Sequence, residues 1–145
     1  MSTVGTILAG KGPQVHTIAP GATVLEATQL MNQHKIGALV VMEDEHLSGI
    51  FTERDVLRRV VGNLSPLAQI KVADVMTQEV MCCKPTTEID EAGRIMRDCR
   101  VRHLPVCDED GHLVGLLSIG DINAYHVRDQ EATIRLMNEY IHGRV

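Results

Sequence analysis

Apolar and polar positions in the first half of the chain predict short strands and helices in a fixed order. A β-like run at residues 15–18 precedes a segment with helical periodicity. The apolar face of that helix holds Val24, Ala27, Leu30 and Met31. Two further β-like runs, at residues 38–42 and 47–51, flank an acidic turn. Because a second helix is predicted to begin at Thr52, the predicted order is β-α-β-β-α.

The same order recurs about 65 residues later. VHTIAPGATVLEATQLMNQHKIGALVV at 15–41 aligns without a gap with VMCCKPTTEIDEAGRIMRDCRVRHLPV at 80–106. After one inserted residue in the next turn, GIFTERD at 49–55 aligns with GLLSIGD at 115–121. VGTIL and VADVM form a weaker echo, one ahead of each copy. The pattern indicates a tandem duplication.

We therefore expect an α/β (α+β) fold of two β-α-β-β-α repeats related by a pseudo-two-fold axis. The first repeat is predicted at 1–62, with its core at 15–61, and residues 63–71 form a linker. The second is predicted at 72–145, with its core at 80–128 and a C-terminal helix. Because a unit of about 60 residues buries a modest fraction of its surface, the halves should pair and leave two clefts between them.

Capping residues mark the helix starts. Thr23 and Glu26 have the spacing of a Thr-x-x-Glu capping box. In the second copy Glu88 occupies the position of Thr23, so Thr87 with Asp90 is the predicted box.

An apolar stripe marks the helix predicted at the C-terminal end of the chain. Ile134, Met137 and Ile141 have helical spacing there. Such a stripe usually packs on its own domain, and the alternative is docking on a second subunit.

Composition and charge narrow the function classes. Apolar residues make up 44% of the 145 positions, which is enough for a core. The net charge of −5 argues against binding to nucleic acid or to an anionic membrane surface. Neither a spanning apolar run nor a signal-peptide pattern is present in this sequence. We therefore expect a cytoplasmic location, where the four cysteines would be thiols.

Motif searches predict neither a metal site nor an enzyme. The cysteines lack CxxC spacing and the seven histidines lack HExxH spacing. No Gly-rich phosphate loop, GxSxG elbow or lysine-containing NTPase motif occurs. We expect a protein without catalytic residues.

The hydroxyl-x-x-Asp spacing of Thr52 with Asp55, and of Ser118 with Asp121, permits two interpretations. Both are helix capping boxes, each worth about 1 kcal/mol. A helix N-terminus also attracts phosphate, and a neighbouring carboxylate accepts hydrogen bonds from ribose hydroxyls. The two interpretations are compatible, and spacing alone favours the capping box.

Both copies of the repeat contain motifs, in matching order, that closely resemble those of the cystathionine-β-synthase (CBS) domain. These motifs are VxTIxPxxTVxEAxxxM, KIGALVV and GIFTERD in the first copy and RHLPV and GLLSIGD in the second. Nearly the whole chain resembles a CBS pair, or Bateman module. The resemblance implies a regulatory module that binds an adenine nucleotide (AMP, ADP, ATP or NAD) or S-adenosylmethionine between the repeats, and often a homodimer. It also implies Asp55 and Asp121 as ribose ligands, with Thr52 and Ser118 near the phosphates.

Further site residues follow from the resemblance and from position. Arg102, His103 and Pro105 belong to RHLPV, where Arg would bind phosphate and His103 would tune affinity with pH. The first copy has Gly37 and Ala38 there, so its phosphate charge would be met by Arg54 or by the other repeat. The adenine edge is assigned by position to Thr17, Ile18, Cys83 and Lys84.

Gly120 makes the two clefts unequal. Glycine in a helical first turn costs about 1 kcal/mol relative to alanine, so its presence suggests close approach of a ligand or a backbone. Arg54 stands at that position in the first copy.

Two other functions stay open at this level. One is a structural dimerisation scaffold with empty clefts. The other is a thiol redox switch at Cys82-Cys83, which is less favoured because buried thiols in strands are usually inert.

Overall fold

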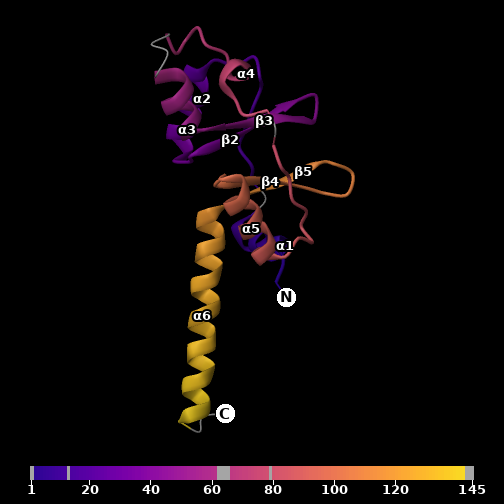
Figure 1. Cartoon of the computed structure of the whole chain (residues 1–145), viewed down its shortest axis with the longest axis vertical. Helices are drawn as coiled ribbons and strands as arrows, with labels where there is room; N and C mark the ends of the chain where they lie inside the picture. Colours follow the sequence, from indigo (N-terminus) through magenta and orange to yellow (C-terminus); the bar gives the residue numbers. More distant parts are fainter. Residues whose placement is uncertain (1, 13, 62–65, 79, 143–145) are drawn as a thin grey trace.

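The computed structural model describes residues 2–12, 14–61, 66–78 and 80–142, and its two halves stack one on the other (Figure 1). The first half contains β1 (Thr17–Ile18), α2 (Val24–His34), β2 (Ala38–Glu43), β3 (His46–Thr52), α3 (Glu53–Asp55) and the π-helical turn η1 (Val56–Val60). The second half contains α5 (Ile89–Cys99), β4 (His103–Cys107), β5 (Leu113–Ser118) and α6 (Ile119–Ile141). Two short helices complete the set, α1 (Val4–Lys11) and α4 (Val72–Val75). This confirms the predicted fold class; residues 62–65, around the start of the predicted linker, lie outside the described residues.

Each half is built on one antiparallel strand pair, β2–β3 or β4–β5. Both pairs shift register near the hairpin, after Val41 in one and after Val106 in the other. In the first half β1 adds a parallel strand to β2. In the second half the predicted strand at 80–83 shrinks to a single parallel bridge between Cys83 and Val106.

One predicted helix cap is confirmed and the other is wrong. Thr23 caps α2, where its hydroxyl accepts the Glu26 N–H at 3.1 Å. At α5 the N-cap is Glu88, without a side-chain cap hydrogen bond. The Thr87 hydroxyl accepts the Lys84 N–H at 3.0 Å instead, so it closes the preceding turn and is not used to start the helix.

The helices that precede the two repeats are exchanged between the halves. The Val4 N–H donates to the carbonyl oxygen of Thr87 at 2.8 Å, which attaches α1 to the second half. The Val72 N–H donates to the carbonyl oxygen of Ala22, also at 2.8 Å, which attaches α4 to the first half. Val4 and Val72 are both fully buried. Sequence periodicity identified the echo between these segments but not the exchange.

Two hydrophobic cores result, one per half. The first-half core contains Val24, Ala27, Met31, Leu39, Val41, Phe51, Val60, Val72, Val75 and Met76. The second-half core contains Val4, Ile7, Cys83, Ile89, Ala92, Met96, Leu104, Val106, Leu117 and Ile122. Each core is therefore completed by a helix from outside its own β-α-β-β-α unit.

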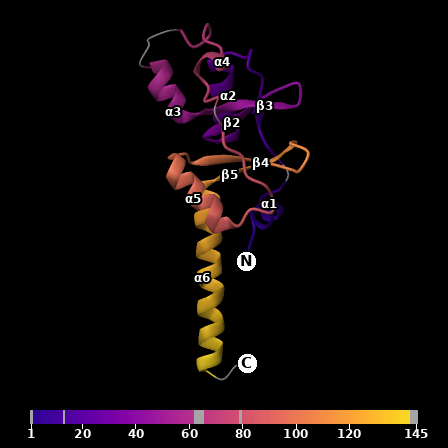
Figure 2. The ribbon, with the colours of Figure 1, turned by 45° about the vertical axis from the view of Figure 1, so that its right-hand side comes forward.

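The helix α6 begins in the second half and extends 23 residues to Ile141. Its C-terminal part projects away from the rest of the molecule (Figure 2). The apolar stripe predicted to pack on its own domain is exposed instead: Ile134 and Met137 are each 58% exposed, and Ile141 is 70% exposed. Within the described residues, no helix combines the length and apolarity that crossing a membrane requires.

Candidate functional site

A cavity of about 220 Å³ lies where the two halves meet. The first half and the segment that follows α4 contribute the lining residues Gly37, Ile50, Thr52, Glu53, Arg54, Asp55, Arg58, Arg59 and Thr77. The second half contributes Arg100, Val101, Arg102 and His103. The cavity thus joins the hydroxyl-x-x-Asp motif of one repeat to the RHLPV motif of the other.

Asp55 is the buried carboxylate of this cavity, with only 6% of the residue exposed. One of its oxygens, Oδ2, accepts the Thr52 N–H at 2.9 Å, as a capping box requires. The other, Oδ1, lies 3.4 Å from the Thr77 hydroxyl, which donates to it, and 3.8 Å from Arg59 Nε. The capping interpretation therefore holds in the structure. The Thr52 hydroxyl also donates to Oδ2, at 3.3 Å. Because each carboxylate oxygen has two acceptor sites, Oδ2 is filled and Oδ1 retains the acceptor capacity that Asp55 has left.

Positive charge dominates the lining. Five arginines face two carboxylates there, although the chain as a whole carries a net charge of −5. Arg54, Arg58 and Arg102 are exposed and keep long, mobile side chains. Arg59 instead donates to the carbonyl oxygens of Val75 and Met76, at 3.1 and 2.9 Å, and ties η1 to α4. The cavity is therefore suited to an anion.

The residues Arg102 and His103 of the second repeat both line the cavity that contains Thr52 and Asp55. Arg54 lines it as well, so both sources that we expected for the phosphate charge of the first cleft, Arg54 and the other repeat, are present there. Their contact with a ligand stays a prediction. Burial lowers the pKa of His103, and the nearby Lys11 ammonium lowers it further; Asp121 and Glu53 act in the opposite direction. His103 is therefore coupled electrostatically both to Glu53 of the cavity lining and to Lys11 and Asp121 beside the second motif.

Asp121, the counterpart of Asp55, sits in different surroundings. Its Oδ2 accepts the Ser118 N–H at 2.9 Å, and the Ser118 hydroxyl accepts the Asp121 N–H at 3.0 Å. The Lys11 ammonium donates to the same Oδ2 at 2.8 Å. Burial alone would raise the pKa of Asp121, but the hydrogen bonds from Lys11 and Ser118 outweigh it and the pKa is lowered. The surroundings of the two aspartates are thus unequal. The predicted effect of Gly120 against Arg54 stays a prediction.

Of the predicted residues in β2, in β4 and just before β2, Ala38 and Pro105 lie outside the cavity lining and Gly37 belongs to it. Ala38 and Pro105 are buried in β2 and β4 and pair with Thr52 and Leu116 across their hairpins. Gly37 lines the cavity, and the space that a Cβ would fill there is bounded by the Glu53 carboxylate, 3.3 Å away.

The four residues assigned to the adenine edge lie on the first strand or bridge of each repeat. Thr17 and Ile18 form β1 and pair with Val40 and Val41. Cys83 is buried in the second core. Lys84 is exposed and forms an ion pair with Glu109 at 3.2 Å. Their role toward a ligand stays a prediction.

Sequence reasoning missed several residues of the site: Ile50, Glu53, Arg58, Arg59, Thr77, Arg100 and Val101 in the cavity, and Lys11 beside Asp121. Arg58 lies four residues after Arg54, a helical spacing that could have placed both on one face. Thr77 and Lys11 had no such signal, because the exchange of α1 and α4 brings them to the motifs.

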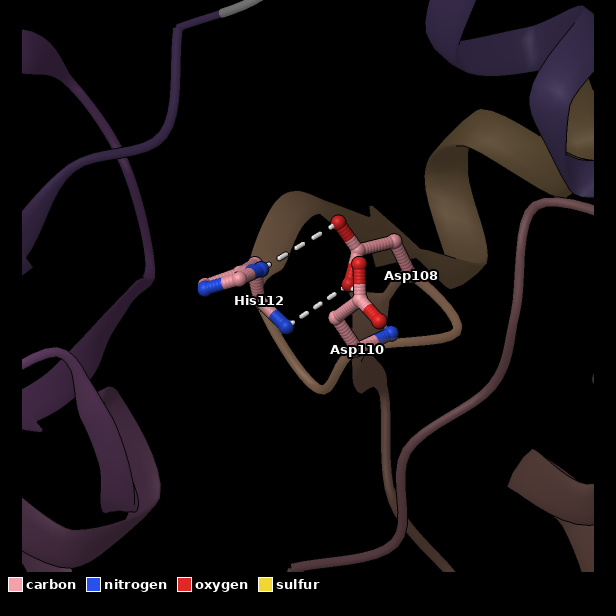
Figure 3. Close-up of side chains that lie close together, drawn as sticks. All are labelled: Asp108, Asp110 and His112. Carbon is pink, nitrogen blue, oxygen red and sulfur yellow. Dashed lines mark hydrogen bonds and ion pairs between the residues drawn. The ribbon is translucent and has the colours of Figure 1, made fainter.

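The hairpin turn after β4 gathers three residues with metal-ligating side chains, Asp108, Asp110 and His112, whose ligand atoms lie within 4.8 Å of one another (Figure 3). Asp108 Oδ1 accepts the backbone N–H groups of Asp110 and His112, each at 2.9 Å. The hydrogen bond from the His112 N–H is the main cause that lowers the pKa of Asp108. Closure of the turn accounts for this arrangement, and the predicted absence of a metal site stays a prediction.

The vicinal cysteines have high thiol pKa values. Burial and the neighbouring Cys107 raise the pKa of Cys82 to about 12, and the same two causes raise that of Cys83 to about 11. Because the thiolate is the reactive species, these environments disfavour the redox-switch hypothesis.

Comparison with known proteins identifies relatives that all contain CBS domains. The family model for the CBS domain matches residues 11–62 and 72–127. The mitochondrial CBS domain-containing protein CBSX3 of Arabidopsis thaliana is 38% identical over 126 residues, which cover 83% of this chain and 61% of that protein. The CBS domain-containing protein YhcV of Bacillus subtilis is 33% identical over 125 residues, covering 86% of this chain and 88% of that protein. An inosine-5'-monophosphate dehydrogenase of Methanocaldococcus jannaschii is 38% identical over 109 residues, but these make up only 21% of that protein.

Solved structures agree with the sequence relatives. A CBS-domain protein from Agrobacterium tumefaciens superposes with a TM-score of 0.81 at 37% identity, covering 87% of this chain and 99% of that one. CBSX2 in complex with AMP superposes with a TM-score of 0.76 at 28% identity, covering 90% and 99% of the two chains. The family model and the relatives account for the repeated hydroxyl-x-x-Asp motif and for the two similar halves. This chain belongs to the CBS-domain family and carries two CBS domains in tandem.

Proposed function

We propose that this chain is a regulatory module that binds an adenine nucleotide in the cavity at Asp55 and signals through the arrangement of its two halves. The observation that carries the proposal is the meeting of Thr52 and Asp55 from one repeat with Arg102 and His103 from the other. The AMP complex of the related CBSX2 supports this class of ligand.

The ribose would bind at Asp55. The carboxylate is fixed in place by the Thr52 N–H and the Thr77 hydroxyl. Vicinal ribose hydroxyls are two adjacent donors: one would donate to the acceptor site that remains at Asp55 Oδ1, and the other would replace the long contact from the Thr77 hydroxyl. The same residue thus caps the helix and presents the ligand contact.

The phosphates would bind among the arginines. A guanidinium group offers a planar pair of donors that matches two phosphate oxygens, and it keeps its charge at all relevant pH values. Arg102 and Arg100 come from the second half, whereas Arg54 and Arg58 come from the first. A phosphate held by both sets would link the halves, which gives the ligand a direct effect on their arrangement.

The size of the cavity sets a condition on binding. Its volume of about 220 Å³ is below the roughly 300–1,000 Å³ of drug-sized ligand pockets. Arg54, Arg58 and Arg102 are exposed at its rim. A nucleotide therefore enters when these flexible side chains move outward and then close on the phosphates.

Binding should stabilise the folded chain by linkage. A ligand that binds only the folded state adds about 2.7 kcal/mol at a hundredfold excess over its Kd. For a chain of this length, about 3 °C of Tm corresponds to 1 kcal/mol, so the expected rise in Tm is roughly 8 °C.

Thermal unfolding with AMP, ATP, NAD or adenosine tests the proposal, with Asp55→Asn combined with Asp121→Asn as the site variant. Asparagine keeps an acceptor for the capping N–H but lacks the charge. We expect the Tm rise in the unaltered chain and its loss in the double variant. No Tm change with any nucleotide would leave a dimerisation scaffold with empty clefts as the better description.

We also propose that the module acts as a homodimer. Leu57 and Val61, on and just after η1, are 68% and 56% exposed. Leu57 lines a surface hollow between α2 and η1, together with Met31, Ile36 and Val56. Burial of this apolar surface against a second copy would remove it from water. Sedimentation equilibrium of the unaltered chain and of Leu57→Glu tests this, and a monomer in both cases would contradict it.

A further inference from the structure

The C-terminal part of α6 exposes an apolar stripe that the rest of the described chain does not cover. We call Val127, Ile134, Met137 and Ile141 the α6 stripe; their exposed fractions lie between 53% and 70%. Every residue from Val127 to Asn138 is exposed, and this part of the helix projects away from both halves (Figure 2). Packing within one copy of the chain therefore leaves these side chains in water.

A projecting helix of this length gains little stability by itself. Helices shorter than about 12–15 residues are marginal in water, and most helical stability in proteins comes from packing of an apolar face. Residues 127–141 form about four turns at 3.6 residues per turn. Pairing of the α6 stripe with another surface would supply the missing packing.

The spacing of the α6 stripe is that of a helix that pairs with another helix. Val127, Ile134 and Ile141 follow one another at intervals of seven residues, and Met137 follows Ile134 by three. These are the a and d positions of a heptad repeat. Gln130 occupies the remaining d position in this stretch, and a polar residue in such a seam restricts register at a cost in stability. A second helix with the same spacing fits the stripe, and a second copy of this chain provides one.

Charges beside the stripe indicate that the two copies run antiparallel. Within the described residues, none of the ion pairs involves Glu131 or Arg135. If a two-fold axis crosses the pair near Thr133, Glu131 of each copy lies opposite Arg135 of the other. A parallel pair in register would instead place each of these charges level with its own counterpart. A surface hollow of about 420 Å³ on this side of α6 is lined by Glu131, Ile134, Arg135, Asn138, Glu139 and His142.

The same axis also matches the apolar residues. Ile134 of one copy meets Ile134 of the other beside the axis. Val127 of each copy lies between Met137 and Ile141 of the other, because the two ends of the stripe are almost equally far from Thr133. One antiparallel arrangement therefore satisfies both the charges and the apolar seam.

We propose that α6 pairs in antiparallel orientation with α6 of a second copy of this chain. The pairing does not depend on nucleotide binding, and it is separate from the contact proposed at Leu57 on η1. Two different two-fold contacts on one chain join more than two copies, so the two proposals together lead to an assembly larger than a dimer.

Sedimentation equilibrium of the full chain in the Leu57→Glu background tests the pairing, because that substitution is designed to remove the η1 contact. Ile134→Asp then places a charge at the centre of the seam. Ala132→Asp is the matched control, since it adds the same charge at an exposed position on the opposite side of α6. Far-ultraviolet circular dichroism and Tm values check that every variant folds.

Charge reversal in the same background tests the orientation. Glu131→Arg alone and Arg135→Glu alone each replace attraction across the axis by repulsion. In an equimolar mixture of these two variants, one copy carries two positive side chains and the other two negative ones, so the cross-axis pairs form again. An effect confined to one helix cannot be rescued by mixing.

We expect the Leu57→Glu chain to dimerise. Ile134→Asp should raise the dimer Kd by more than about tenfold, whereas Ala132→Asp should change it by less than about threefold. Each charge reversal should raise the Kd by about fivefold, and the mixture should return it to within about twofold of the parent.

Three results would overturn the proposal. A Leu57→Glu chain that is monomeric up to about 0.1 mM would mean that the α6 stripe stays in water or is covered by a different protein. Equal effects of Ile134→Asp and Ala132→Asp would exclude the stripe as the seam. A mixture that pairs no more tightly than its two components would exclude the antiparallel orientation.

Discussion

Truncation of Val4 to alanine tests whether α1 belongs to the core of the second half. Val4 is fully buried in a core whose other members, apart from Ile7, begin at Cys83, 79 positions away in sequence. Val4→Ala removes the equivalent of two methylene groups from that core, or about 1.6 kcal/mol at 0.8 kcal/mol per group. The cavity left behind adds up to about 1 kcal/mol. We therefore expect a loss of about 2–3 kcal/mol in the free energy of unfolding.

Urea unfolding followed by far-ultraviolet circular dichroism measures this loss. The matched control is Thr6→Ala, which changes an exposed residue of the same helix and should alter stability by less than about 0.5 kcal/mol. Val72→Ala, the equivalent change in α4, should cost about as much as Val4→Ala, because both valines are fully buried.

The corresponding fall in Tm is about 6–10 °C for a chain of this length. If Val4→Ala were as harmless as Thr6→Ala while Val72→Ala was costly, α1 would not be part of the second core. The exchange of helices between the halves would then be refuted.

Three further outcomes follow from the cavity and the hairpins. Arg102→Ala should weaken AMP binding by about 10–100-fold, which corresponds to the loss of a hydrogen bond to a charged group. Arg94→Ala, on the exposed side of α5, should leave AMP binding unchanged. Equal effects of the two substitutions in calorimetry would contradict the assigned phosphate contact. Because the folded-state pKa of His103 is lowered from 6.5, the unfolded chain binds more protons below that pH, so stability should fall as pH drops through 6.5 toward the folded pKa. His103→Gln should lose less stability between pH 7.5 and 5.5, and identical pH dependence would argue against this assignment. Gly49→Ala should lower the free energy of unfolding by about 1–3 kcal/mol, which is more than Gly115→Ala should. The Cβ at position 49 would lie 2.6 Å from a backbone carbonyl oxygen, whereas the Cβ at position 115 would meet a leucine side chain at 2.7 Å, and a side chain can move aside more easily. The reverse order in urea unfolding would contradict this reasoning.

Local pattern was enough to predict most elements of the fold. The strands β2 and β3, the cap at Thr23 and the helix starts at Thr52 and Ser118 all depend on residues within a few positions of one another. The failed cap at Thr87 has a local cause as well, since one hydroxyl had two possible backbone partners and the turn at Lys84 took it.

The composition of the site was harder to predict because it depends on contacts between distant segments. Each aspartate could be identified from the repeated motif, but not its neighbours. Arg102 reaches the cavity of Asp55 only because the halves face each other, and Lys11 reaches Asp121 across 110 positions. No periodicity of the chain encodes which half supplies the cations. The sequence therefore identified the motif residues, whereas the residues that surround them depend on contacts between distant segments.

The exchange of α1 and α4 has a consequence for synthesis on the ribosome. The core that buries α1 extends to Ile122, so the last residue of that core is translated about 118 residues after Val4. At about 5–20 residues per second, α1 waits roughly 6–24 s with its apolar face uncovered. By contrast α4 meets an already translated first half. The nascent first half thus acquires its missing helix early, whereas the second half is complete only when α1 packs against segments translated much later.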